Sequence, residues 1–436
     1  MAHWGIAMSY YHPLWQPPLD PAFEAKGRDQ ITQAAEIKSG SAREAGFISA
    51  LTTLYSDTDS VPLRDRMKKY EEAMGNVAEQ NPADIESQIF YALALLSVAP
   101  PTDQAHAYQK KAVAILEPLY AKYPQHPGIA HYLIHACDNT EMAAQGLKPA
   151  RDYSQIAPSA PHALHMPSHI FTRLGMWNDS VQSNLAARKA AHDQGDIGEE
   201  LHAMDYLAYA YLQLGRDYEV GQLLNDLSKM TSLPAQDFKV SYAASAMPVR
   251  YAVERGRWSA AAKIQPMDGA PPQVVAVSVW ATALACAHLN NISCAKAGVR
   301  TLYGIERKLQ TAGDGYWSKV VGIYAMEVTA WLALAERDPN SPTVFMRGAA
   351  DIEDALEKLP VTPGPVLPAR EQLGELWLAM NEPVNALKEF EVALKLSPGR
   401  RNSIVGALKA AQLSGQSDKV ATYQAALKAI SPGSPQ

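Results

Sequence analysis

The chain has 436 residues, more than one compact core usually holds, so it forms either several globular domains or one extended array of repeats. The formal net charge is −6 and no dense Lys/Arg segment occurs, which argues against nucleic acid or an anionic membrane as the main partner. Phenylalanine is scarce, with 7 residues, and few segments show the two-residue period of a strand, so an array of helices is favoured. No apolar run approaches the ~20 residues of a membrane-spanning helix.

The first residues read as the middle of a helix, with Trp4-Gly5 at a turn position. No helix cap and no signal peptide precede them. We therefore expect the chain to begin on a half-repeat or to lack upstream residues, and both a periplasmic and a cytoplasmic location stay open for this soluble chain. The next stretch is less regular, with helices expected near 21–38 and 40–55 and a loop around 57–61.

Beyond this stretch, turn residues and prolines recur at intervals of 34 to about 42 residues. The turns lie at Leu174-Gly175, Leu214-Gly215, Arg255-Gly256, Asn290-Asn291 and Glu336-Arg337-Asp338, and Pro82, Pro124 and Pro158 end earlier helices. Such intervals are typical of helix-turn-helix repeats. We expect roughly eight or nine hairpins, enough for about one superhelical turn whose ends approach each other and partly close the inner groove.

The clearest repeat lies near the C-terminus. Seven of its residues have the spacing and the residue types of a tetratricopeptide repeat: Leu373, Gly374, Trp377, Ala386, Phe390, Ala393 and Pro398. A further repeat is expected to end at Pro432. The predicted fold class is therefore all-α, a tetratricopeptide-like right-handed superhelical solenoid of antiparallel helix pairs.

The sequence predicts five segments along the chain. They are a partial first repeat with an irregular helical stretch (1–64), repeats that carry a His-rich groove (65–260), divergent helical repeats (261–360), a Pro-rich connector with the last repeats (361–432) and a tail (433–436).

Two histidine pairs lie 34 residues apart, at equivalent positions of neighbouring repeats. His131 and His135 form the first pair, and His165 and His169 form the second. A spacing of four residues places both imidazoles of a pair on one helical face. The four histidines take positions 5 and 9 of their repeats, which tend to face the concave groove. The sequence therefore predicts four imidazoles on one patch of that groove.

Neighbouring groove positions carry further polar side chains. The additional predicted metal ligands are His162, His202 and Asp205. The predicted substrate contacts are Asp138, Tyr209, Arg250 and Arg370. Arg250 is as readily interpreted as an ordinary surface arginine.

Imidazole and carboxylate groups are ligands of zinc, iron and copper. Zinc is the first expectation, because it accepts such ligands without redox demands, and iron or copper follows. A metal-free polar or pH-sensitive groove stays open, and so do purely structural histidines. A metal site is favoured because seven of the twelve histidines fall in these three repeats, all but His192 at groove-facing positions.

The first pair has the histidine spacing of zincin proteases, but Tyr132 replaces the glutamate that acts as their base, which excludes a direct match. Paired H-x-x-x-H helices also occur in dinuclear copper proteins, so a two-metal centre is conceivable. Pro167 lies inside the second pair and is expected to weaken or kink that helix, because proline removes a backbone donor.

Residues 360–371 are rich in proline. One interpretation is a rigid connector in which Pro368 begins the next helix. The other is a lid loop that brings Arg370 and Glu371 to a ligand. The connector is favoured, because short connectors between helices are the rule.

Cys286 and Cys294 flank the expected turn at Asn290-Asn291. A disulfide across one hairpin and a pair of small buried thiols both fit this spacing. The thiols are favoured, because the sequence does not supply the geometry that a disulfide requires.

The chain resembles a widespread, largely uncharacterised group of bacterial tetratricopeptide-repeat proteins. The resemblance rests on residues 126–136, 161–171 and 361–371 and covers nearly all of the chain. It implies the repeat fold and names no reaction. Members of this group often carry more sequence before the Trp-Gly segment. The resemblance also leads us to expect an aromatic residue at the position of Cys137, directly before Asp138.

Two functions follow as hypotheses. In the first, a metal-centred groove binds a small molecule or peptide, and a vacant coordination position allows its transformation by a hydrolase or an oxidase. In the second, a metal-free tetratricopeptide scaffold captures a segment of a protein or peptide partner. Three or more ligand atoms within coordination reach, with one side vacant, would favour the first.

Overall fold

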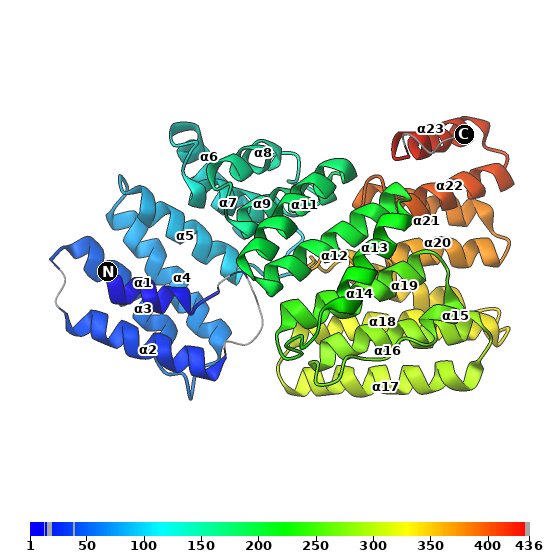
Figure 1. The fold of residues 1–436 in the computed structure, drawn as a ribbon, viewed down its shortest axis with the longest axis horizontal. Coiled ribbons are helices and arrows are strands. Elements are labelled where there is room, and N and C mark those ends of the chain that lie inside the picture. Colours follow the sequence, from blue (N-terminus) through cyan, green and yellow to red (C-terminus); the bar gives the residue numbers. More distant parts are fainter. Residues whose placement is uncertain (13, 15–19, 38–39, 432–436) are drawn as a thin grey trace. The chain divides into compact units, whose positions relative to one another are not determined.

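The structure, a computed structural model, describes residues 1–12, 14, 20–37 and 40–431. All regular secondary structure in these ranges is helical, and successive helices pack as hairpins (Figure 1). This confirms the predicted all-α tetratricopeptide-like solenoid. The predicted repeat end at Pro432 and the tail 433–436 lie outside the described residues.

The chain forms two compact units, Met1–Ala157 and Pro158–Gln436. The first unit contains α1 (Ala2–Ser9), α2 (Pro21–Glu36), α3 (Ala42–Tyr55), α4 (Leu63–Gln80), α5 (Ile85–Val98), α6 (Ala107–Lys122), α7 (Pro127–Cys137) and α8 (Leu147–Ile156). Helices α2 and α3 match the helices expected near 21–38 and 40–55, although residues 38 and 39 are outside the described ranges. The five predicted segments stay predictions.

The second unit begins with α9 (Pro161–His165) and α10 (Pro167–Arg173), which together form the first member of a hairpin with α11 (Trp177–Gln194). The later pairs are α12 (Ile197–Leu214) with α13 (Asp217–Lys229), α14 (Phe238–Glu254) with α15 (Trp258–Ala261), α16 (Pro272–His288) with α17 (Ile292–Thr311), α18 (Gly315–Ala335) with α19 (Ser341–Asp354), α20 (Ala369–Ala379) with α21 (Pro383–Leu396), and α22 (Arg401–Leu413) with α23 (Ser417–Ala429).

The C-terminal signature residues pack as the repeat pattern predicts. Phe390 is fully buried, and a Cβ atom at Gly374 would lie 2.8 Å from its ring. A Cβ atom at Gly406, in the next repeat, would lie 2.3 Å from the same ring. Both glycines are therefore required for the close approach of their helices to Phe390.

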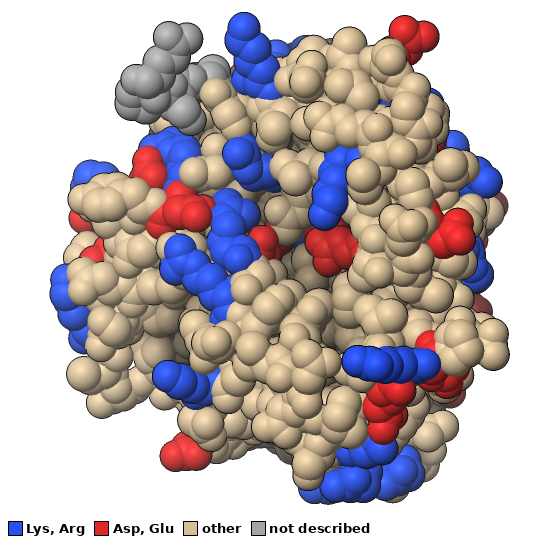
Figure 2. All heavy atoms as spheres, turned by 90° about the vertical axis from the view of Figure 1, so that its right-hand side faces the viewer, with Lys and Arg blue, Asp and Glu red and all other residues tan. Residues whose placement is uncertain are grey.

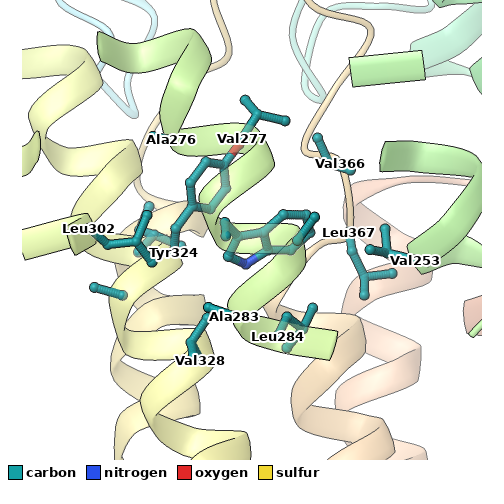
Figure 3. Close-up of a cluster of buried hydrophobic side chains, with 14 of the residues drawn as sticks. Val253, Ala276, Val277, Ala283, Leu284, Leu302, Tyr324, Val328, Val366 and Leu367 are labelled. Atoms are coloured by element: carbon teal, nitrogen blue, oxygen red, sulfur yellow. The ribbon is translucent and has the colours of Figure 1, made fainter. Parts of the chain in front are cut away.

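The core of the second unit centres on α16 and α18. Trp280 is fully buried and stacks on Tyr324, with ring centroids 5.0 Å apart. Val366 and Leu367, from the segment between α19 and α20, belong to the same hydrophobic cluster (Figure 3). Among the described residues, α18 alone is long and apolar enough to cross a membrane, but 61% of its apolar window is buried inside the protein, as in a core helix.

Two segments that lie far apart along the second unit are in contact. The indole of Trp177 donates a 2.8 Å hydrogen bond to the carbonyl of Gly399. Gly175 has φ +68, and a Cβ atom there would lie 2.3 Å from the carbonyl oxygen of Pro398. Only glycine allows this turn and this approach together.

A buried ion-pair cluster stabilises the same contact between distant segments of the second unit. Arg400 is fully buried and donates to Glu254 at 2.6 Å and to Glu371 at 2.8 Å. Its guanidinium also lies 3.2 Å from the hydroxyl of Tyr209. Because unpaired buried charges are costly, this clasp, formed by Arg400, Glu254 and Glu371, holds α14, α20 and the start of α22 together.

The expectation of two buried thiols at Cys286 and Cys294 is wrong, because these residues form a disulfide. The turn between α16 and α17 is so short that it brings the two Cα atoms to 5.8 Å, within the range a disulfide needs. Cys137, in the first unit, is a buried free thiol, and burial raises its pKa to about 12.

Candidate metal centre

Pro167 divides the helix that carries the second histidine pair. Helix α9 ends at His165 and α10 begins at Pro167, with Met166 in a turn between them. Proline has no N–H to donate, so the helical ladder is interrupted there, as expected. The interruption does not separate the pair, because the Nε2 atoms of His165 and His169 are 3.1 Å apart.

His202 of α12 completes a cluster of three imidazoles. One potential ligand atom from each of His165, His169 and His202 lies within 4.8 Å of the others. The rings of His165 and His202 have centroids 4.3 Å apart. All three residues are buried, with exposed fractions of 1%, 1% and 2%.

Hydrogen bonds orient the first two imidazoles. Nδ1 of His165 lies 2.7 Å from Oδ1 of Asn184 on α11. The amide nitrogen of Asn184 donates to the carbonyl of Ser180 at 2.8 Å, so its oxygen faces His165 and accepts. His165 therefore carries its proton on Nδ1, which leaves a lone pair on Nε2.

Tyr206 of α12 has a similar relationship with His169. Its hydroxyl donates to the carbonyls of Pro360 and Thr362, each at 3.2 Å, and lies 3.5 Å from Nδ1 of His169. Since the hydroxyl has one proton and a carbonyl can only accept, its oxygen is oriented to accept from His169 Nδ1–H. Both Nε2 atoms of the pair then present lone pairs to the same point.

The electrostatic setting keeps the imidazoles of His165 and His202 neutral. Burial, and after it the neighbouring His202 and His169, hold the pKa of His165 well below its ordinary value of 6.5. Burial likewise lowers the pKa of His202, against an opposing effect of the Glu199 carboxylate. Neutral imidazole is the form that binds metal ions.

The donor set fits a zinc-class ion. Zinc binds imidazole nitrogen at about 2.0–2.1 Å, so two ligands of one tetrahedral ion are about 3.3 Å apart, close to the Nε2–Nε2 separation of the pair. Within the described part of the chain, the three-histidine group includes no carboxylate or thiolate. Three imidazoles leave at least one coordination position for water or another ligand.

The first histidine pair lies in the other unit. His131 and His135 on α7 have Nε2 atoms 3.1 Å apart, and both residues are partly exposed. The ring of His131 stacks on Tyr153, with an interplanar angle of 11°. The prediction that both pairs share one site spans the two units and stays a prediction.

His162 and Asp205 have other surroundings. Nδ1 of His162 lies 3.6 Å from a carboxylate oxygen of Glu199. Asp205 is fully buried and accepts from Nε of Arg250 at 2.8 Å, so its carboxylate is held in an ion pair. Within the second unit, the three-histidine cluster includes neither residue.

The predicted substrate contacts also differ in their surroundings. Arg250 is fully buried, which excludes the surface-arginine interpretation, and its guanidinium and that of Arg400 both lie over the ring of Tyr209. Arg370 forms ion pairs with Asp351, Asp354 and Glu389. Asp138 is the C-cap residue of α7 in the first unit.

Asn184 and Tyr206, which orient the imidazoles, were not predicted from the sequence. Neither belongs to a recognisable motif. Tyr206 lies four residues after His202, so it shares the helical face of that histidine. Asn184 lies on the second helix of its hairpin, where no groove pattern applies, and only the packing of α11 against α9 reveals it.

No family model and no curated protein matches the chain. Similar solved structures include a human IFIT1 dimer with m7Gppp-AAAA, at 11% identity and a TM-score of 0.40, covering 94% of this chain and 87% of that one. The Cut9–Hcn1 hetero-tetramer of APC/C has 11% identity, a TM-score of 0.35 and coverages of 94% and 78%. Yeast Tom70 has 13% identity, a TM-score of 0.34 and coverages of 95% and 70%. All are helical-repeat proteins, and the likeness concerns the kind of fold only.

Proposed function

We propose that this chain is a metal-binding tetratricopeptide-like protein whose second unit holds one zinc-class ion through His165, His169 and His202. The observation that carries the proposal is the pair of Nε2 atoms 3.1 Å apart, with both Nδ1 atoms directed at oxygen acceptors. Two facing lone pairs repel each other unless a cation or a proton lies between them. Zinc is the first candidate, and iron or copper follows.

The buried position of the cluster supports a ligand-binding role more than a role in surface recognition. A bound ion with a vacant position would polarise a small molecule, a peptide carbonyl or a water, which is the chemistry of hydrolysis and oxidation. Asn184 and Tyr206 hold the imidazoles in the binding tautomer. The alternative is a metal-free scaffold, in which a proton joins the two Nε2 atoms.

The test is metal analysis of protein purified without a histidine tag and reconstituted with zinc, iron or copper in turn. We expect about one equivalent in the second unit, lost in His165→Ala and in His169→Ala with little loss of helical circular dichroism. His192→Ala is the matched control, because this imidazole lies on α11 with 72% of its side chain exposed.

A second control separates the two units. The double variant His131→Ala/His135→Ala removes the pair in the first unit and should leave the equivalent in the second unit unchanged. Less than about a tenth of an equivalent after reconstitution with each metal would reject the metal site in favour of the scaffold.

A further inference from the structure

Residues 359–368, hereafter the strap, run through the interior of the second unit. They connect α19 to α20, yet most of them are buried, including Val361 (3% exposed), Val366 (1%) and Leu367 (4%). An exposed connector would not bury its apolar side chains in this way. The strap is therefore packed as a part of the core (Figure 3).

Side chains from the first helices of several repeats bind the strap through its backbone. Tyr206 of α12 donates to the carbonyls of Pro360 and Thr362. Arg250 of α14 donates to the carbonyls of Gly364 and Pro365, at 3.3 and 3.2 Å.

The two ends of the strap are bound in the same manner. The hydroxyl of Tyr316 on α18 accepts from the N–H of Leu359 at 3.2 Å, and the side chain of Gln372 on α20 donates to the carbonyl of Leu367 at 3.1 Å. First helices line the inner surface of a tetratricopeptide array, so the strap lies along that surface.

The composition of the strap suits a buried segment without regular secondary structure. Irregular backbone can be buried only if its polar groups find partners. Four of its ten residues are prolines, which have no N–H to satisfy. The backbone groups that still need partners are mainly carbonyls, and tyrosine, arginine and glutamine side chains donate hydrogen bonds to these carbonyls.

We propose that the strap is a built-in ligand of the second unit: it occupies the inner groove as a bound peptide would, and it excludes any external peptide while it is in place. The partner that this surface fits is thus a segment of the same chain. The inference is independent of the metal site, and its test is carried out in the presence of a chelator.

The experiment uses the full chain with residues 359–367 replaced by glycine and serine at unchanged length. A labelled synthetic peptide with the sequence of residues 357–370 is titrated by fluorescence anisotropy, beside a peptide of the same composition in scrambled order. We expect saturable binding to the replaced variant, at least about tenfold tighter than for the scrambled peptide. The intact chain should bind neither, because its tethered strap competes at an effective concentration on the order of millimolar.

Two results would overturn the inference. One is a replaced variant with the helical circular dichroism of the intact chain that binds both peptides equally. If the replaced variant does not fold, hydrogen exchange on the intact chain decides. The amides of Val366 and Leu367 should then exchange as slowly as those of α14. Exchange as fast as in the exposed turn at residues 57–60 would show that the strap does not occupy the groove.

Discussion

The hydroxyl of Tyr206 lies 3.5 Å from Nδ1 of His169, and the same hydroxyl donates to two carbonyls of the strap. One side chain thus connects the histidine cluster with the segment that fills the inner groove. The connection is polar on both sides and fully buried, since Tyr206 has no exposed surface. The histidine cluster and the strap therefore share one hydrogen-bonding oxygen atom.

Tyr206→Phe removes the acceptor that holds His169 in its binding tautomer. We expect metal affinity to fall by about 10- to 100-fold, the usual effect of losing such a partner, while helical content is unchanged. Competition with a chelator of known affinity measures the change. Tyr218→Phe on α13 is the control, because this residue is 75% exposed, and equal affinities for the two variants would contradict the assignment.

Zinc should stabilise the second unit. A ligand that binds only the folded state at 100 times its Kd adds about 2.7 kcal/mol, which appears as a higher Tm. The Tm of His202→Ala should not respond to zinc. Thermal unfolding with and without zinc tests this, and an equal response of the intact chain and the variant would count against the site.

The acid sensitivity of the protein should depend partly on His288. Its ring stacks on Trp258 at 3.8 Å and lies 4.2 Å from Trp331, and burial lowers its pKa to about 4. The unfolded chain binds a proton near pH 6.5 and the folded one only near 4, so stability is lost as the pH falls through this window.

His288→Phe keeps the stacking and removes the titration. Urea unfolding at pH 7 and pH 5 should therefore show a smaller loss of stability for the variant than for the parent. The buried histidines of the metal cluster contribute the same loss to both proteins, so only the difference is informative. Equal losses would mean that His288 is not held neutral.

Reduction of the disulfide should loosen the hairpin of α16 and α17. Cys286 and Cys294 are 8 residues apart. The chain-entropy relation gives a contribution of about 2–3 kcal/mol for so short a loop. Reductant should lower the Tm of the parent and leave Cys294→Ser unaffected. A variant that still responds to reductant would place the sensitivity elsewhere.

The closure of the second unit should be sensitive to a single methyl group. Gly175 and Gly195 both have positive φ at the end of a helix, so alanine costs about 1–2 kcal/mol at either position. Only at Gly175 does a Cβ atom also meet the carbonyl of Pro398, while nothing lies within 4 Å of the one at Gly195. Gly175→Ala should therefore destabilise the chain clearly more than Gly195→Ala in urea unfolding.

The charge balance alone says little about partners. On the face shown in Figure 2, basic and acidic side chains are interspersed over a largely uncharged surface. This agrees with the sequence, in which no basic segment stands out. A single strongly charged ligand is not indicated by that face.

The sequence predicted the fold well because a repeat encodes its packing locally. The spacing of Gly374 and Phe390 specifies how one hairpin closes, and the glycine of each Leu-Gly turn marks its end. The arrangement of the histidine pairs could also be predicted from the sequence, because helical periodicity places residues four apart on one face. Pro167 was correctly identified as a point of interruption.

Long-range contacts were not readable from the sequence. Nothing local indicates that Arg250 meets Asp205 and the strap, or that Asn184 orients His165. The same limit explains the error at Cys286 and Cys294, where the tightness of one turn decides between thiols and a disulfide. The strap connects α19 and α20, as the favoured interpretation expected, but its burial was not predicted, because prolines suit exposed and buried irregular segments alike.

The clasp between Glu254 and Arg400 joins residues 146 positions apart, and this affects how the protein is made. Most repeat arrays can be assembled one hairpin at a time, since each new repeat rests only on the one before it. In this protein Glu254, which carries the buried carboxylate, is synthesised long before Arg400, whose guanidinium neutralises it. At that stage the early hairpins of the second unit are fully synthesised, but the charge of the Glu254 carboxylate is not yet neutralised. The second unit therefore reaches its final state only after Arg400 has been synthesised.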